Sequence, residues 1–174
     1  KNTLDWGDVL LGNSRVVAVI DGADSPHHLS PGGGTLLDLV ARDAQRGAAA
    51  DELNQVMQSV GILPDDAVHY HRIELLDESP RLVAVIARGR LDGRPDGDVV
   101  TRYEVRPCEP GVRVRTELHH GGRDEQAFML SDVYWWGDRE VTPFVPLKGQ
   151  GFVHPELDLL ELDASIFDVP FMVA

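Results

Sequence analysis

Polar and apolar side chains alternate regularly in two neighbouring segments of the chain. In residues 99–106, Val99, Thr101, Tyr103 and Val105 alternate with more polar residues, and residues 112–119 repeat the pattern. Successive side chains of a strand point to opposite faces, so this alternation is typical of antiparallel strands that bury one face. Turn-forming residues separate five predicted strands, at 67–76, 81–90, 98–106, 112–118 and 126–136, and a last strand is predicted at 157–162.

The first forty residues predict three more strands. Two short apolar runs within residues 7–21 flank Gly12, Asn13 and Ser14, which indicates a β-hairpin with a positive φ at Gly12 or Asn13. A third strand is expected at residues 35–40. Three glycines at 32–34 precede it, and no Lys-Ser or Lys-Thr follows them. We therefore interpret them as a close approach of two backbone segments and not as a phosphate loop.

One segment, residues 48–60, favours a helix. Leu53, Val56, Met57 and Val60 follow helical spacing, acidic residues occupy the first turn, and Gly61 follows the last one. One helix among many short strands predicts a mainly β protein. The expected fold is an antiparallel β-sandwich or barrel with one short helix. At this length we expect a single domain over residues 1–174.

The charge balance limits the partners that the chain can have. Its 16 basic and 29 acidic residues give a net charge of −13, and no run of Lys or Arg offers a footprint for phosphate backbones. We therefore expect neither nucleic acid nor an anionic membrane surface as a partner. The sequence has no stretch of 18 apolar residues, so we expect no membrane span and no signal peptide in this chain. A single cysteine, Cys108, rules out an internal disulfide.

A pair of tryptophans, Trp135 and Trp136, ends the strand predicted at 126–136. Neighbouring side chains of a strand point to opposite faces, so one of the two rings faces away from the core. Such a ring could stack on a sugar while nearby carboxylates accept hydrogen bonds from its hydroxyl groups. The alternative is that the loop at 143–152 folds over the ring. The candidate ligand-binding residues are Asp132, Tyr134, Trp135, Trp136, Asp138 and His154.

The histidines support a second hypothesis, a metal site. His69 and His71 lie two residues apart on a predicted strand, which places both rings on one face, and Glu74 follows them. This His-x-His with its Glu, and the Gly-x-x-His that ends at His154, resemble the two metal-binding motifs of cupins. The candidate ligands of a divalent metal ion are His69, His71, Glu74 and His119, with His154 as a further one. The alternative is that these residues form an ordinary polar face of the sheet.

Four passages together resemble one family: GDVLLGNSRVVAVI at 7–20, PGGGTLLD at 31–38, LSDVYWWG at 130–137 and PFVPLKGQGF at 143–152. They are similar to the N-terminal β-sandwich region of bacterial surface or periplasmic proteins that carry a metallohydrolase domain of the polymerase-and-histidinol-phosphatase type. That region is in turn similar to the galactose-mutarotase-like supersandwich. The resemblance therefore implies an antiparallel β-sandwich of supersandwich type, either whole or as a fragment of a larger sandwich.

The resemblance implies a non-catalytic accessory domain of an extracytoplasmic bacterial protein, in the periplasm or at the cell surface. Its role would be structural or carbohydrate-binding, without a cofactor. Its partners would be neighbouring domains of a larger parent protein and a glycan. The histidine hypothesis implies a different class of protein, a metal-dependent enzyme of cupin-like or sugar-epimerase-like type.

Overall fold

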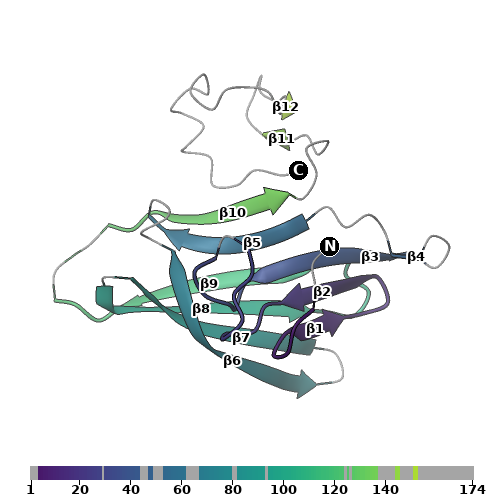
Figure 1. Cartoon of the computed structure of the whole chain (residues 1–174), viewed down its shortest axis with the longest axis horizontal. Coiled ribbons are helices and arrows are strands. Elements are labelled where there is room, and N and C mark those ends of the chain that lie inside the picture. Colours follow the sequence, from purple (N-terminus) through teal and green to yellow (C-terminus); the bar gives the residue numbers. More distant parts are fainter. Residues whose placement is uncertain are drawn as a thin grey trace. The chain divides into compact units, whose positions relative to one another are not determined.

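The structure is a computed structural model of the 174-residue chain (Figure 1). It describes residues 4–28, 30–43, 47–48, 53–61, 67–79, 82–92, 94–123, 125, 127–136, 144–145 and 151–152. The chain divides into two compact units, Lys1–Trp135 and Trp136–Ala174, and each is described by itself. The described residues are mainly β and contain no helix.

The first sheet has the strand order β1-β2-β3-β5-β10, with a short strand, β4, beside β3 (Figure 1). Its strands are β1 Val9–Gly12, β2 Val16–Ile20, β3 Leu36–Asp43, β4 Gly47–Ala48, β5 Leu53–Val60 and β10 Leu130–Trp136. The pairs β1 with β2, β2 with β3, and β3 with β5 are antiparallel. The chain therefore enters this sheet as a hairpin and returns to it with β10 after building the second sheet.

The second sheet is an antiparallel meander in which each strand pairs with the next along the chain. Its strands are β6 Val68–Ser79, β7 Leu82–Leu91, β8 Arg94–Val105 and β9 Arg113–His120. These four elements confirm the strands predicted at 67–76, 81–90, 98–106 and 112–118, and β10 confirms the strand predicted at 126–136. The strand predicted at 157–162 lies outside the described residues.

The two sheets form an antiparallel β-sandwich, as the alternation predicted. Val99, Thr101, Tyr103 and Val105 of β8 are all buried, so the face predicted to be internal is internal. Two tyrosines of the second sheet reach the first sheet through their hydroxyl groups. Tyr103 donates to the carbonyl oxygen of Gly34 at 3.0 Å, and Tyr70 donates to Oε1 of the buried Gln58 at 3.1 Å. Buried polar groups at the interface thus have partners, as they need.

The helix predicted at 48–60 is wrong, because residues 53–60 form strand β5. All but one residue of β5 is buried, which means that both faces of the strand are covered. A strand covered on both faces is under no pressure to alternate, so polar residues stand on either face where they find a buried partner. Gln55 and Gln58 do so. The helical spacing of the remaining apolar residues is therefore coincidental.

The hairpin predicted in residues 7–21 is confirmed, with Val9 opposite Ile20 and Gly12 opposite Val17. The prediction of a positive φ at Gly12 or Asn13 is wrong, since neither residue adopts one. The turn is instead held by the side chain of Asn13, whose Oδ1 accepts hydrogen bonds from the backbone N–H groups of Arg15 and Val16. An asparagine side chain can replace a backbone acceptor in this way.

The glycines at 32–34 allow the close approach that the sequence predicted. A Cβ atom on Gly33 would lie 1.5 Å from the carbonyl oxygen of Gly22, so no other residue fits there without moving the backbone. Gly34 has a φ of +79° and faces the ring of Tyr70. The segment before β3 therefore lies tightly against the end of β2, where the site described below is formed.

In the second unit the described residues form one short antiparallel pair, β11 Phe144–Val145 with β12 Gly151–Phe152. Across the described parts of both units, none of the residues forms a helix long and apolar enough to span a membrane.

Candidate functional site

The candidate residues predicted around the tryptophan pair do not share one surface. Asp132 and Tyr134 are exposed on one face of β10, and Asp132 accepts a hydrogen bond from Nε2 of Gln58 at 3.2 Å. Trp135 is half-buried and lies on the opposite face, by strand alternation. Its ring meets the ring of His28 edge-on, with 4.9 Å between centroids. The side chain of Trp136, and the residues Asp138 and His154, lie outside the described part of the chain.

The histidines predicted as metal ligands lie on the outer face of the second sheet. The strand register places His69, Arg90, Asp98 and His119 in one cross-strand row, so the Arg90–Asp98 ion pair separates the two histidines. Three strand spacings amount to about 14 Å, far beyond the reach of one metal ion.

The other two predicted ligands do not complete a site. His71 falls at an irregularity in the β6–β7 pairing and lines, with Asp98 and His119, a depression of about 310 Å³. Glu74 is held between Arg72 and Arg88 at 2.9 and 3.4 Å. His69 lies 3.7 Å from the carboxylate of Asp92 instead. The structure therefore does not bring these four residues together.

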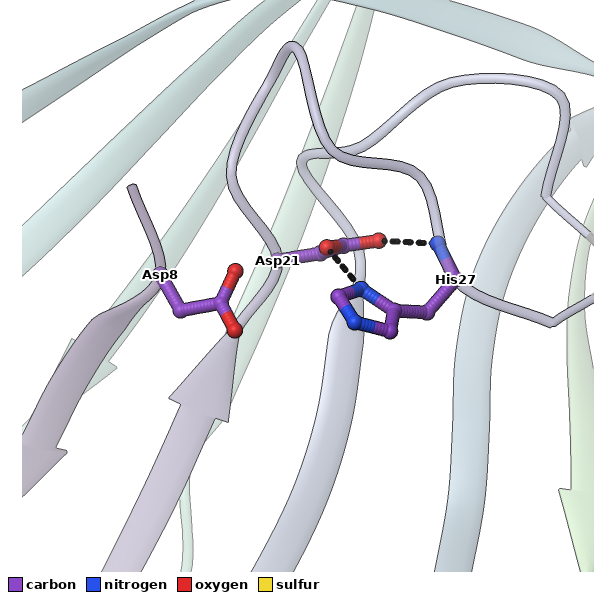
Figure 2. Close-up of side chains that lie close together, drawn as sticks. All are labelled: Asp8, Asp21 and His27. Atoms are coloured by element: carbon purple, nitrogen blue, oxygen red, sulfur yellow. Dashed lines mark hydrogen bonds and ion pairs between the residues drawn. The ribbon is translucent and has the colours of Figure 1, made fainter. Parts of the chain in front are cut away.

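Three other side chains do converge, and we refer to Asp8, Asp21 and His27 as the acidic corner (Figure 2). Asp8 directly precedes β1 and Asp21 directly follows β2, so the pairing of Val9 with Ile20 sets them beside each other. His27 comes from the loop between β2 and β3. One ligand atom from each of the three side chains lies within 4.8 Å of the others, and this is the one such group among the described residues.

Asp21 and His27 form the buried part of the acidic corner. The Asp21 side chain is fully buried and that of His27 is about one fifth exposed. Nδ1 of the His27 ring lies 2.8 Å from Oδ1 of Asp21, and the backbone N–H of His27 donates to Oδ2 at 3.1 Å. Both oxygens of the carboxylate are thus fixed by one residue of the loop, which orients the imidazole ring.

The pKa values of Asp21 and His27 are both raised, but for different reasons. Burial raises the pKa of the Asp21 carboxyl group, while the hydrogen bonds from His27 oppose that shift. The hydrogen bond to Asp21 raises the pKa of the His27 imidazole, with the nearby carboxylates adding to it. The pair therefore retains a proton to higher pH than the same two groups would in water.

Asp8 is fixed by backbone donors and not by a cation. Its Oδ1 accepts a hydrogen bond from the N–H of Gly22 at 2.8 Å, and its Oδ2 accepts one from the N–H of Asp5 at 2.8 Å. Among the described residues, no Lys or Arg forms an ion pair with Asp8 or Asp21. The acidic corner therefore contains two carboxylates and only one imidazole.

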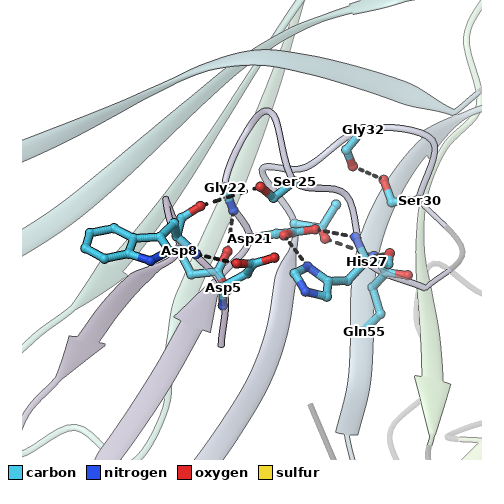
Figure 3. A network of polar contacts seen from close by, with 11 residues as sticks. Asp5, Asp8, Asp21, Gly22, Ser25, His27, Ser30, Gly32 and Gln55 are labelled. Carbon is cyan, nitrogen blue, oxygen red and sulfur yellow. Dashed lines mark hydrogen bonds and ion pairs between the residues drawn. The ribbon is translucent and has the colours of Figure 1, made fainter. Parts of the chain in front are cut away.

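The loop that carries His27 is held in place by the buried strand beneath it (Figure 3). Gln55 of β5 donates from Nε2 to the carbonyl oxygen of His27 and to Oγ1 of the buried Thr35, both at 3.0 Å. Gln55 is itself 1% exposed. The buried side chain of Gln55 thus helps to fix the position of His27 in the acidic corner.

Aromatic residues lie near the acidic corner, either close by in the chain or through ring contacts. Trp6 lies in the turn before β1 and is 95% exposed, and its carbonyl oxygen accepts a hydrogen bond from Oγ of Ser25 at 3.5 Å. On the other flank, the rings of His27 and His28 are 6.2 Å apart and His28 contacts Trp135. A series of contacts therefore leads from the predicted residue Trp135 to the acidic corner. Such an arrangement can stack on an apolar face and accept hydrogen bonds, or it can coordinate a cation.

The sequence reasoning missed Trp6, Asp8, Asp21 and His27. A signal existed for the two aspartates, because residues that flank the paired ends of a predicted hairpin must lie opposite each other. No comparable signal existed for His27, which is placed by a loop without periodicity, or for the exposure of Trp6.

Comparison with family models, with curated proteins and with solved structures finds no match to this chain. The resemblance to the sandwich regions of bacterial surface proteins therefore stays a prediction. The case for a function rests on the geometry of the acidic corner and its flanking aromatic rings.

Proposed function

We propose that this chain is a non-catalytic accessory domain that binds neutral carbohydrate at the acidic corner and its flanking aromatic rings. The observation that carries the proposal is the exposure of Trp6, which is 95% exposed and lies two residues before Asp8 in the chain; its backbone N–H donates to the carboxylate of Asp5. Tryptophan is on average a largely buried residue, and an exposed indole in a segment that also carries fixed acceptors suits a ligand with both an apolar face and hydroxyl groups.

The magnitude of stacking is sufficient for measurable binding. A sugar ring that covers about 100 Å² of the Trp6 indole would gain about 2.5 kcal/mol from apolar contact. The hydroxyl groups of the same sugar find acceptors close by, since each Asp8 oxygen receives one backbone hydrogen bond and has a further lone pair. Trp135 and His28 offer a second aromatic contact on the opposite flank.

The charge of the chain selects among carbohydrates. The net charge is −13 and the acidic corner is itself rich in carboxylates, so uronic acids and sulfated sugars would be repelled. Neutral hexose oligosaccharides fit the same donors and acceptors without that repulsion. We therefore propose neutral sugars as the ligand class.

The setting of the domain follows from the resemblance described above. Four passages of this sequence are similar to the sandwich regions of bacterial extracytoplasmic proteins, which precede other domains. We propose the same setting here, with neighbouring domains of a parent protein as partners. An accessory domain that binds glycan would hold such a protein at its carbohydrate substrate or at the cell surface.

The test compares the glycan binding of matched variants by calorimetry, after screening a panel of neutral oligosaccharides. We expect Trp6→Ala to weaken binding between tenfold and one hundredfold, and Trp6→Phe to weaken it less, because a smaller ring still stacks. Leu75→Ala is the control, since Leu75 is also an exposed apolar side chain, at 62%, but lies on β6 of the other sheet. Unchanged affinity in Trp6→Ala, or a panel without any neutral ligand, contradicts the proposal.

A further inference from the structure

We propose that Asp8, Asp21 and His27 form a binding site for a divalent transition-metal ion of the zinc or manganese kind. The site is distinct from the histidine set that the sequence suggested, and the proposal stands whether or not the domain binds a sugar. It rests on the convergence of three potential ligands, on the burial of one carboxylate that has no Lys or Arg partner among the described residues, and on the hydrogen bonds that hold the ligands in place.

The distances suit a single ion. One ligand atom of each residue lies within 4.8 Å of the other two. Two ligands on opposite sides of an ion, each about 2.2 Å away, are about 4.4 Å apart, and ligands on neighbouring positions are closer. The three atoms therefore reach one coordination sphere after movements of a few tenths of an ångström. Water or a sugar hydroxyl would complete the coordination.

The charges of the acidic corner favour a cation. Asp21 is fully buried, Asp8 is half-buried, and in the described part of the chain neither is paired with Lys or Arg. A buried carboxylate is costly unless its charge is compensated. The side chain of His27 contacts Asp21, and in the described part of the chain Asp8 forms no ion pair with a Lys or Arg side chain. A divalent ion would neutralise both carboxylates at once.

The ligand set favours a transition metal over calcium or magnesium. Calcium takes six to eight oxygen ligands, and magnesium retains most of its water, whereas an imidazole nitrogen with two carboxylates suits zinc or manganese. The ligands are also held before the ion arrives. Backbone N–H groups of Gly22 and Asp5 fix Asp8, and the N–H of His27 fixes Asp21. Such outer contacts orient metal ligands and support their affinity.

The competing explanation is a structural pair in which Asp21 and His27 only bond each other. The variant Asp8→Asn separates the two explanations. It removes a charged ligand and the hydrogen bond from the exposed backbone N–H of Asp5, but its amide oxygen can still accept the hydrogen bond from Gly22, so the Asp21–His27 pair remains. This change would leave a purely structural Asp21–His27 pair intact, whereas a metal site would lose most of its affinity for the ion.

The experiment measures metal content and thermal stability on the full chain. Wild type, Asp8→Asn and His69→Gln are stripped with chelator, incubated with Zn²⁺, Mn²⁺ or Ca²⁺, desalted and analysed for metal, and their melting temperatures are recorded with and without each ion. His69→Gln removes an exposed His–Asp pair elsewhere, as a control for surface binding.

We expect one Zn²⁺ or Mn²⁺ per chain in wild type and in His69→Gln, and less than about one tenth of that in Asp8→Asn. At ten times the dissociation constant the melting temperature of wild type should rise by about 3 to 6 °C, and chelator should abolish the rise. Ca²⁺ should give a smaller shift than either transition ion. Equal metal content in wild type and Asp8→Asn, no stoichiometric metal in wild type, or a preference for Ca²⁺ would each overturn the proposal.

Discussion

The outer face of the second sheet and the acidic corner both carry charged groups, but these groups differ in burial and in pairing. On the outer face, Arg and acidic residues alternate around a depression of about 470 Å³, and pairs such as Arg90–Asp98 are exposed at both ends. In the acidic corner a buried carboxylate has one imidazole as its partner. Exposed pairs are screened by water and contribute little, whereas a buried, incompletely compensated charge has large consequences.

The difference shows that a functional site cannot be identified from the number of charged residues alone. The seven arginines of the second sheet's outer face, at positions 72, 88, 90, 102, 106, 113 and 115, each have an acidic neighbour in ion-pair distance. Burial, together with the lack of a matching cation, singles out the acidic corner. Four predictions test this account, in order of decreasing effect.

The largest effect is expected on removing the buried carboxylate. Asp21→Ala breaks both hydrogen bonds to His27 and frees the loop above β5, so it should lower the free energy of unfolding by about 3 kcal/mol. The matched control, Asp98→Ala, breaks an exposed ion pair and should cost less than about 1 kcal/mol. Urea denaturation of both variants gives the comparison. Similar losses in the two would show that burial does not distinguish the regions.

A smaller effect is expected at the polar contacts between the sheets. Tyr103→Phe removes the hydroxyl group that donates to Gly34, and should cost about 1 to 2 kcal/mol at neutral pH.

Because Tyr70 and Tyr103 are both buried, we also expect a loss of stability at alkaline pH. Burial raises the pKa of both Tyr70 and Tyr103 above the ordinary value near 10. The unfolded chain therefore releases these protons before the folded chain does. The contribution of the two tyrosines to the free energy of unfolding should be constant below pH 10. Above pH 10 it should fall by about 1.4 kcal/mol per pH unit for each tyrosine. Unfolding curves between pH 9 and 11 should show a shallower decline for Tyr103→Phe, and an unchanged decline would contradict this assignment.

The smallest effect is expected on the outer face. Arg115→Ala removes one exposed partner of Glu117, at 2.9 Å, and should change the free energy of unfolding by no more than about 0.5 kcal/mol. Added salt should reduce even that difference, because it screens exposed charges. A loss of 2 kcal/mol or more in chemical denaturation would mean that the outer-face network is itself a structural element.

The sequence predicted the parts of the fold in which one face meets water. In β8, Tyr103 and Val99 face the core while Arg102 faces out, and the alternation is therefore visible. In β5 both faces are buried, so Gln55 and Gln58 disrupt the pattern and the segment resembles a helix. A strand buried inside a sandwich can be identified only from the strands that it pairs with. Those contacts are long-range, so no short stretch of sequence reveals them.

The candidate site was predictable only in part, for the same reason. Trp135 was identified from its strand, and it does contact the loop that carries His27 and His28. Asp8 and Asp21 could have been found from the hairpin register. The position of His27 depends on the close contact of Gly33 with Gly22 and on the hydrogen bond from Gln55, both of which arise only in the folded chain.

The most direct test of the account is an NMR titration of the ¹⁵N-labelled chain with a neutral oligosaccharide that binds it. The account predicts that the indole N–H signal of Trp6 and the backbone signals of Asp8, Gly22 and His27 shift together and saturate at one dissociation constant. Signals from the outer face of β6 to β9 should stay in place. Shifts confined to that outer face, with Trp6 and His27 unchanged, would contradict the claim that the acidic corner and its aromatic flanks are the functional site.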